Sequence, residues 1–175
     1  INDFAVQIYG IPYLKKNQFS TIQNGTNPKV ANNDLHAIVG AGTGLGIARG
    51  IISGREVRVL ASEGGHVEYS PKSKLEWELK IWLKNSLNVE RISCERIVSG
   101  SGLSRIAEWR LSKSDAKNHP LQKYLQKIKI SDSLRKELPK KICTLSNEGD
   151  QLMIEVENMW LSAYASLLGD VALQE

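Results

Sequence analysis

Three apolar, β-prone runs follow one another with very short connections in the first half of the chain. The runs cover residues 36–40, 47–52 and 56–61, and a turn around Gly54 separates the last two. A parallel crossover needs about a dozen residues or more, so strands this close in sequence must pair antiparallel. Alternation of apolar and polar residues in the third run is typical of a half-buried strand. The sequence therefore predicts a three-stranded antiparallel sheet.

After this sheet the apolar residues recur at helical spacing. They predict helices over residues 73–86, 102–111, 121–129, 131–138 and 148–173. A short helix is also expected over 4–11, ended by Pro12, and a short strand over 96–99. Residues 17–33 are rich in Asn, Thr and Gly, and we expect them to form a loop.

Composition places the chain among folded globular proteins. It has 175 residues, of which 41% are hydrophobic and 24% charged. No run of about 18 apolar residues predicts a membrane span, and no basic, apolar leader opens the chain. Cys94 and Cys143 do not have metal-ligand spacing, and two lone thiols fit a reducing compartment, so we expect a cytoplasmic protein. The chain starts without methionine and stops inside a helical pattern, so we expect a piece of a longer protein.

The net charge of +4 is unevenly distributed. Residues 110–141 carry ten Lys or Arg and three Asp or Glu. Basic tracts can bind nucleic acid, but this tract has one aromatic residue, Tyr124, and no RNA-binding or helix-turn-helix pattern. We interpret the tract as a solvated helical face, and we expect neither a nucleic-acid partner nor a membrane partner.

The segment GAGTGLG, residues 40–46, lies between the first two expected strands. A dinucleotide-binding loop that starts at Gly40 needs glycine where Leu45 stands, and a Walker A loop needs a lysine that is absent. What remains is a glycine-rich turn with one hydroxyl, that of Thr43. Such a turn can direct backbone N–H groups at phosphate oxygens. The alternative is a tight hairpin whose glycines are needed for positive φ values.

The segment SEGGHVEYSP, residues 62–71, places a carboxylate, two glycines and an imidazole in a row. The glycines lack a Cβ atom, so a ligand could approach the main chain there. Glu63 can accept hydrogen bonds from two vicinal hydroxyls, and His66 can donate or accept one. The alternative is a simple turn with a solvated Glu63 and a packed His66.

Other polar groups are less distinctive by themselves. Asn2 and Asp3 precede an apolar helical run, as N-cap residues do. A carboxylate at a helix N-terminus is stabilised as the anion, which suits a general base at neutral pH. Glu95, within SCERIVSGSG, is typical of a surface residue. The three histidines have no zinc-ligand spacing, and the G-x-S-x-G elbow of α/β-hydrolases is absent.

Taken in order, four segments resemble the bacterial glucokinase family of the hexokinase/actin-like ATPase superfamily. They are INDF, GAGTGLGIA, SEGGHVEYSP and ERIVSGSGL, and they span residues 1 to about 105. The closing segment LSAYASLLGDVALQE is similar to the family's long helix before its next core strand. The resemblance implies an α/β, partial ribonuclease-H-like fold from the family's large C-terminal domain. It implies a three-stranded sheet over 34–71, a mainly helical insertion over 72–147 and a long core helix over 148–175.

The resemblance also implies roles for individual residues. Asp3 is the expected catalytic general base. The expected substrate-binding residues, which contact glucose hydroxyls, are Asn2, Glu63, His66 and Glu95. Gly42, Thr43 and Gly44 match the family's second phosphate loop, which faces ATP. The resemblance implies no metal ligand within this segment.

The implied activity is ATP-dependent phosphorylation of the 6-hydroxyl of glucose, with Mg²⁺ as cofactor. The family's N-terminal phosphate-loop domain, whose Asp-Gly-Gly-Thr loop carries the magnesium-linked carboxylate, is missing from this sequence. Its C-terminal adenosine motif is missing as well. We therefore expect the 175-residue chain alone to be inactive. Relatives commonly form dimers, so a homodimer is among the expected assemblies.

Alternatives within the same superfamily share these motifs. A non-catalytic sugar-sensing or regulatory module has the sugar residues without turnover, and a kinase for another hexose differs in which hydroxyls it binds. The repressor/kinase group typically carries a cysteine-rich zinc motif after its E-x-G-H segment, which two distant cysteines do not provide. Ser101 stands in SGSGL where relatives often have proline, and we expect this to alter only the stiffness of the turn.

Overall fold

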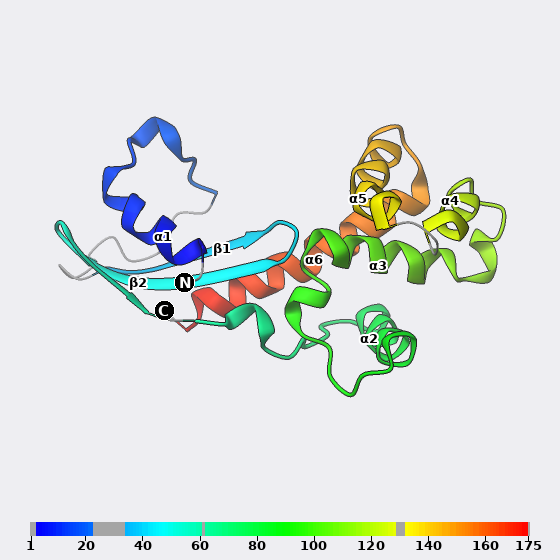
Figure 1. Cartoon of the computed structure of the whole chain (residues 1–175), viewed down its shortest axis with the longest axis horizontal. Helices are drawn as coiled ribbons and strands as arrows, with labels where there is room; N and C mark the ends of the chain where they lie inside the picture. The colour runs from blue at the N-terminus through cyan, green and yellow to red at the C-terminus, as the bar shows by residue number, and fades with distance from the viewer. Residues whose placement is uncertain (1–2, 23–33, 61, 129–131, 175) are drawn as a thin grey trace.

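The computed structural model of the chain describes residues 3–22, 34–60, 62–128 and 132–174, and their arrangement is shown in Figure 1. The α-helices are α1 (Asp3–Gly10), α2 (Lys74–Leu87), α3 (Gly100–Leu111), α4 (Leu121–Ile128), α5 (Asp132–Asn147) and α6 (Gln151–Ala172). The strands are β1 (Asp34–Ala41), β2 (Leu45–Ser53) and β3 (Glu56–Leu60). Short 3₁₀ helices are η1 (Ile11–Tyr13), η2 (Lys16–Gln18), η3 (Gly64–His66), η4 (Cys94–Arg96) and η5 (Ser114–Ala116). Within the described part of the chain, no helix is long and apolar enough to cross a membrane.

The three strands form one antiparallel sheet in the order β1-β2-β3, which confirms the sequence prediction. The first hairpin brings Ala41 opposite Leu45, and the second brings Ser53 opposite Glu56. The second turn contains Gly54 at a φ of +60°, a left-handed value that glycine adopts without steric cost. Of the expected loop over 17–33, residues 23–33 lie outside the described residues.

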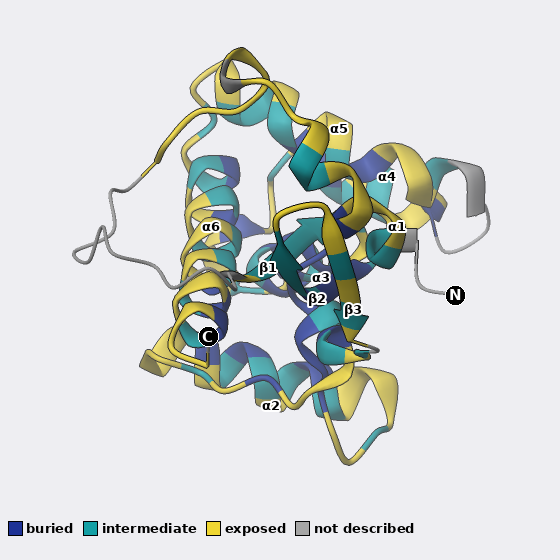
Figure 2. Cartoon of the chain, turned by 90° about the vertical axis from the view of Figure 1, so that its left-hand side faces the viewer, coloured by how far each residue is buried: buried dark blue, intermediate teal, exposed yellow. Residues whose placement is uncertain are grey.

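Helices α1 and α6 lie on opposite faces of the sheet (Figure 1). Side chains alternate between the faces of a strand, so neighbouring residues point to different helices. Gly40 and Gly46 pair across the strands under α1, whereas Ile47 on the other face belongs to the hydrophobic core. The Tyr164 hydroxyl of α6 donates a hydrogen bond to the carbonyl oxygen of Val39 at 3.3 Å. The long helix is therefore fixed to the first strand, and its outer face stays exposed (Figure 2).

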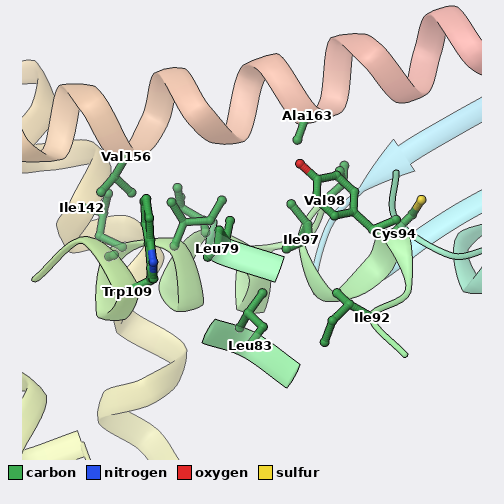
Figure 3. Close-up of a cluster of buried hydrophobic side chains, with 14 of the residues drawn as sticks. Leu79, Leu83, Ile92, Cys94, Ile97, Val98, Trp109, Ile142, Val156 and Ala163 are labelled. Atoms are coloured by element: carbon green, nitrogen blue, oxygen red, sulfur yellow. The ribbon is translucent and has the colours of Figure 1, made fainter. Parts of the chain in front are cut away.

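The core continues from the sheet into the helical part of the chain (Figure 3). Leu79 and Leu83 of α2, Trp109 of α3, Ile142 of α5 and Val156 of α6 are each at most 3% exposed. Burying a large apolar side chain contributes about 1.5–3 kcal/mol. Packing of this kind keeps the helices in place and gives the sheet a rigid support.

Two sequence predictions about this region are wrong. Residues 96–99 do not form a strand, because the chain turns there through η4 into α3 and Ser99 caps that helix by accepting a hydrogen bond from the Gly102 N–H. Helix α5 does not end at 138 but passes through Pro139 to Asn147. An interior proline costs a helix about 3 kcal/mol. Leu138 and Ile142 on either side of it are fully buried, so tertiary packing offsets that cost.

A polar contact joins the segment before α4 to the start of α6. Nε2 of His119 lies 2.8 Å from Oδ2 of Asp150, and Nδ1 of His119 accepts a hydrogen bond from the Leu121 N–H at 3.2 Å. Because Nδ1 accepts a hydrogen bond, the proton of the neutral ring is on Nε2, which donates a hydrogen bond to Asp150. The other carboxylate oxygen caps α6 by accepting from the Met153 N–H at 3.1 Å.

This contact predicts a pH dependence of stability. Burial acts to raise the pKa of Asp150, but hydrogen bonds from His119 and the Met153 N–H outweigh it and hold the pKa below its usual value. A carboxyl group whose pKa is lower in the folded than in the unfolded state stabilises the fold at pH values above its unfolded pKa of about 4. This contribution is lost as the pH falls through the folded pKa. Asp150→Asn keeps a capping oxygen but removes the charge. We expect urea unfolding to show the variant less stable than the native chain near neutral pH, with the gap closing below about pH 4. A gap that is the same at both pH values contradicts this account.

Candidate functional site at the glycine-rich end of the sheet

The turn between β1 and β2 is held by one hydrogen bond within its own backbone and one from the start of α3. The Gly42 N–H donates to the Gly44 carbonyl oxygen at 2.8 Å, and the Gly42 carbonyl oxygen accepts from the Gly100 N–H at 2.8 Å. None of the glycines from 40 to 46 has a positive φ, so conformational freedom is not the reason for their number. The Gly42 N–H is thus engaged within the turn.

Close packing explains two of these glycines. A Cβ atom added to Gly40 or Gly46 would lie within 2.3 Å of the Phe4 ring. The ring of Phe4 therefore rests directly on the two strands, and the first turn of α1 is located at the glycine-rich end of the sheet. Helix α1 begins at Asp3. The side chain of Asp3, and Asn2 as a whole, lie outside what the structure describes, so their predicted roles stay predictions.

The segment with Glu63 and His66 is docked on the start of β2. A Cβ atom on Gly65 would come within 2.3 Å of the Leu45 carbonyl oxygen, so the chain's own backbone occupies the space beside this glycine. The side chains of Glu63 and His66 are 81% and 57% exposed, and their Oε2 and Nε2 atoms are 3.8 Å apart. Contrary to the simple-turn alternative, His66 is not packed. Both side chains are accessible from solvent.

Glu95, in η4, reaches the same residue of β2 from the other side. Its Oε2 atom accepts a hydrogen bond from the Leu45 N–H at 3.2 Å and would lie 2.7 Å from a Cβ atom on Gly44. The Cys94 N–H donates to the Val67 carbonyl oxygen at 2.9 Å, and the Tyr69 N–H to that of Ile92 at 2.8 Å. The segments that carry His66 and Glu95 therefore run side by side, and Leu45 links both to the glycine-rich turn.

The segment that follows His66 is anchored by a buried carboxylate. Glu76, at the start of α2, is 3% exposed. Its Oε2 atom accepts from the Tyr69 hydroxyl at 2.7 Å and from the Lys72 N–H at 2.8 Å. Burial and the bond to Glu76 both raise the pKa of Tyr69, so the hydroxyl keeps its proton and remains a donor. The segment after His66 is thus tied to α2, which holds η3 in position.

A hollow of about 590 Å³ opens next to Gly42 and Thr43. Its other walls come from α3 and α5, and among them is Arg105. Sequence reasoning did not identify this hollow. Arg105 lies one turn into α3, where a basic residue is usually a solvated one, and no sequence spacing connects it with the turn more than 60 positions earlier. Among the described residues, no group of His, Cys, Asp and Glu side chains is arranged to hold a metal ion.

Comparison with known proteins gives a consistent result. The family model described as Glucokinase matches residues 1–175. The glucokinase of Synechocystis sp. is 34% identical over 180 residues, which cover 99% of this chain and 50% of that protein. The glucokinase of Nostoc sp. is 32% identical over 181 residues, which cover 99% of this chain and 52% of that protein. The chain spans about half the length of these curated relatives.

Two crystal structures have the same fold over 99% of this chain and 48% of their own. One is a glucokinase from an Antarctic psychrotroph, with a TM-score of 0.71 and 26% identity. The other, a glucokinase from Balamuthia mandrillaris in complex with glucose, has a TM-score of 0.70 and 22% identity. The predicted α/β fold, with an antiparallel three-stranded start, is thereby confirmed as part of a glucokinase architecture. Because the family model covers every residue, the chain belongs to the glucokinase family.

Proposed function

We propose that the protein containing this sequence phosphorylates the 6-hydroxyl of glucose with ATP, and that this segment supplies the sugar-binding residues, the general base and one phosphate loop. One observation carries the proposal. The turn at 42–44, the segments of His66 and Glu95, and the first turn of α1 all meet around Leu45 and the end of the sheet. Segments up to about 90 positions apart in sequence are thus brought to one place, as a shared substrate requires.

The sugar side of the proposal rests on hydrogen-bonding capacity. Glucose presents hydroxyls that both donate and accept, and the carboxylates of Glu63 and Glu95 accept while His66 donates or accepts. One oxygen of Glu95 is bonded to the Leu45 N–H, which fixes the carboxylate and leaves the other oxygen for the sugar. Asn2 is the proposed amide contact. A site built around hydroxyls rejects an analogue that lacks one by a factor of about 10⁴–10⁵.

The chemical step needs a base next to the primary alcohol. Asp3 is the proposed base, because it is the first residue of α1 and the helix dipole there favours the ionised carboxylate. It would take the proton of the 6-hydroxyl as the oxygen attacks the γ-phosphorus of ATP. The bond from the γ-phosphorus to the β,γ-bridging oxygen breaks, and ADP leaves with that oxygen. General base catalysis of this kind contributes about 10²–10⁴-fold.

The phosphate side involves the turn at 42–44. The N–H groups of Thr43 and Gly44 and the Thr43 hydroxyl are the proposed donors to ATP, whereas Gly42 shapes the turn through its bonds to Gly44 and Gly100. Mg²⁺ is the proposed cofactor, and it neutralises phosphate charge when bound. The described residues contain no ligand cluster for it, so we assign no magnesium ligand to this chain.

A coupled assay for glucose 6-phosphate tests the proposal. We expect ATP-dependent turnover from the full-length protein and none from the 175-residue chain, because the chain spans only half of its relatives. A control with an analogue lacking the 6-hydroxyl should give no product in either case. Absence of turnover by the full-length protein with glucose, together with unimpaired glucose binding, would favour a sugar-sensing module instead. Turnover by the 175-residue chain contradicts the expected inactivity.

A further inference from the structure

The hollow beside the glycine-rich turn is lined by more positive than negative groups. Its walls include Gly42 and Thr43 of the turn, Arg105 and Glu108 of α3, and Arg135 and Lys136 of α5. Its volume of about 590 Å³ is within the range of about 300–1,000 Å³ that is typical of small-molecule sites. Charged groups around such a hollow select the charge of the ligand.

Arg105 is the most constrained of these cations. Its Nη1 group donates to the Arg96 carbonyl oxygen at 3.2 Å and to the Ser101 Oγ at 3.1 Å. A guanidinium has five N–H donors in a planar fork. The Nε–H and both hydrogens of Nη2 have no acceptor among the described residues. Arg105 is thus held by one edge, and its other donors are available to a ligand in the hollow.

The surrounding charges do not neutralise Arg105. The carboxylate in the hollow, that of Glu108, lies 3.9 Å from Nη2 of Arg135 and forms an ion pair with it. Neither Arg105 nor Lys136 forms an ion pair with a described side chain. Burial, followed by the positive charge of Arg96, lowers the pKa of Arg105 despite the opposing effect of Glu108. The guanidinium remains charged at any ordinary pH, so an anion entering the hollow would relieve an unfavourable positive potential.

We propose that Arg105 binds the phosphate groups of the nucleotide donor in this hollow, with Lys136 of α5 as a second phosphate contact. The proposal rests on the proposed function and adds two phosphate-binding residues to it. Phosphate fits the observations because its oxygens accept the parallel N–H groups of a guanidinium fork in a bidentate manner. Thr43 lines the same hollow as Arg105, so a phosphate chain would lie between the turn and α3.

Calorimetric titration of the full-length protein that contains this chain with inorganic tripolyphosphate, ADP and AMP at low ionic strength tests the proposal. We expect affinity to rise by about 10-fold or more from AMP to ADP, since charge-assisted hydrogen bonds are the strong ones. Arg105→Met should remove most of this preference and weaken tripolyphosphate binding by about 10-fold or more, and Lys136→Met should have a smaller effect in the same direction. Arg105→Lys should restore part of the affinity but not the bidentate preference.

The control is Lys127→Met, which removes the same charge from α4 outside this hollow. It should leave all three affinities unchanged, whereas an equal loss in this variant means that net charge alone drives binding and overturns the proposal. Unfolding midpoints without ligand show whether Arg105→Met still folds. If Arg105→Met does not fold, Lys136→Met, at an exposed position, tests phosphate binding in its place. Unchanged ADP and tripolyphosphate binding in both hollow variants overturns the inference while the proposed kinase stands. A native full-length protein that binds neither ADP nor tripolyphosphate also overturns the inference, and a parallel glucose titration then tests the sugar side separately.

Discussion

Replacing Asp3 with alanine in the full-length protein that contains this sequence is expected to lower kcat by about 10²–10⁴-fold while glucose affinity stays nearly the same. In the proposed mechanism the Asp3 carboxylate takes a proton only as the 6-hydroxyl attacks, so its removal should destabilise the transition state more than the bound ground state. The change in kcat is measured by the glucose 6-phosphate assay, and glucose affinity by titration in the absence of ATP.

Asp3→Asn is the matched control for shape. It keeps a polar group of the same size at the start of α1 but cannot accept the proton, so its kcat should fall nearly as far as that of Asp3→Ala. If either variant retains native kcat, Asp3 is not the base. If the variants lose glucose binding in proportion to kcat, the residue contributes binding rather than proton transfer.

The second large effect is expected from Gly65→Ala. A Cβ atom at this position would meet the backbone carbonyl of Leu45 at 2.3 Å, and neither backbone can give way without moving η3 off the strand. Overpacking of this kind costs about 1–3 kcal/mol of unfolding free energy. Because η3 positions His66 beside the segment of Glu95, we also expect glucose affinity of the full-length protein to fall by at least about 10-fold, in line with a loss of one or two hydrogen bonds.

Gly169→Ala provides the control for this substitution. Gly169 lies within α6, and a Cβ atom there has no neighbouring atom within 4 Å. Alanine is a better helix former than glycine by about 1 kcal/mol, so stability should stay equal or increase slightly, with native glucose affinity. The measurements are urea unfolding and glucose titration of both variants. Native stability in Gly65→Ala would contradict the docking of η3 on Leu45.

The sheet could be predicted from the sequence because local signals agree there. The connections between the strands are too short for a parallel crossover, so only antiparallel pairing was possible, and Gly54 marked the second turn. The same holds for α6, whose apolar residues keep helical spacing over its whole length and include the buried Val156 and Val171. In these elements the local pattern and the tertiary packing favour the same structure.

Other features depend on contacts between distant residues, and no local pattern carries them. The β-branched run at 96–99 looks like a strand, yet its apolar side chains are buried in a turn into α3. The glycine-rich segment was interpreted in terms of a ligand or of positive φ, whereas Phe4 occupies the space next to two of its glycines and Glu95 the space next to a third. Arg105 belongs to a hollow that exists only because α3 and α5 lie beside the turn. The sequence motifs thus named candidate site residues, whose roles stay predictions, but they did not indicate the residues packed around them.

The structure of the full-length protein bound to glucose is the most direct test of the account. We predict that sugar hydroxyls lie within about 3.2 Å of the side chains of Glu63, His66 and Glu95, with the Asp3 carboxylate beside the primary alcohol. Glucose bound elsewhere, with Glu63 and His66 still facing only solvent, would contradict the proposal that these segments meet around Leu45 to hold a sugar.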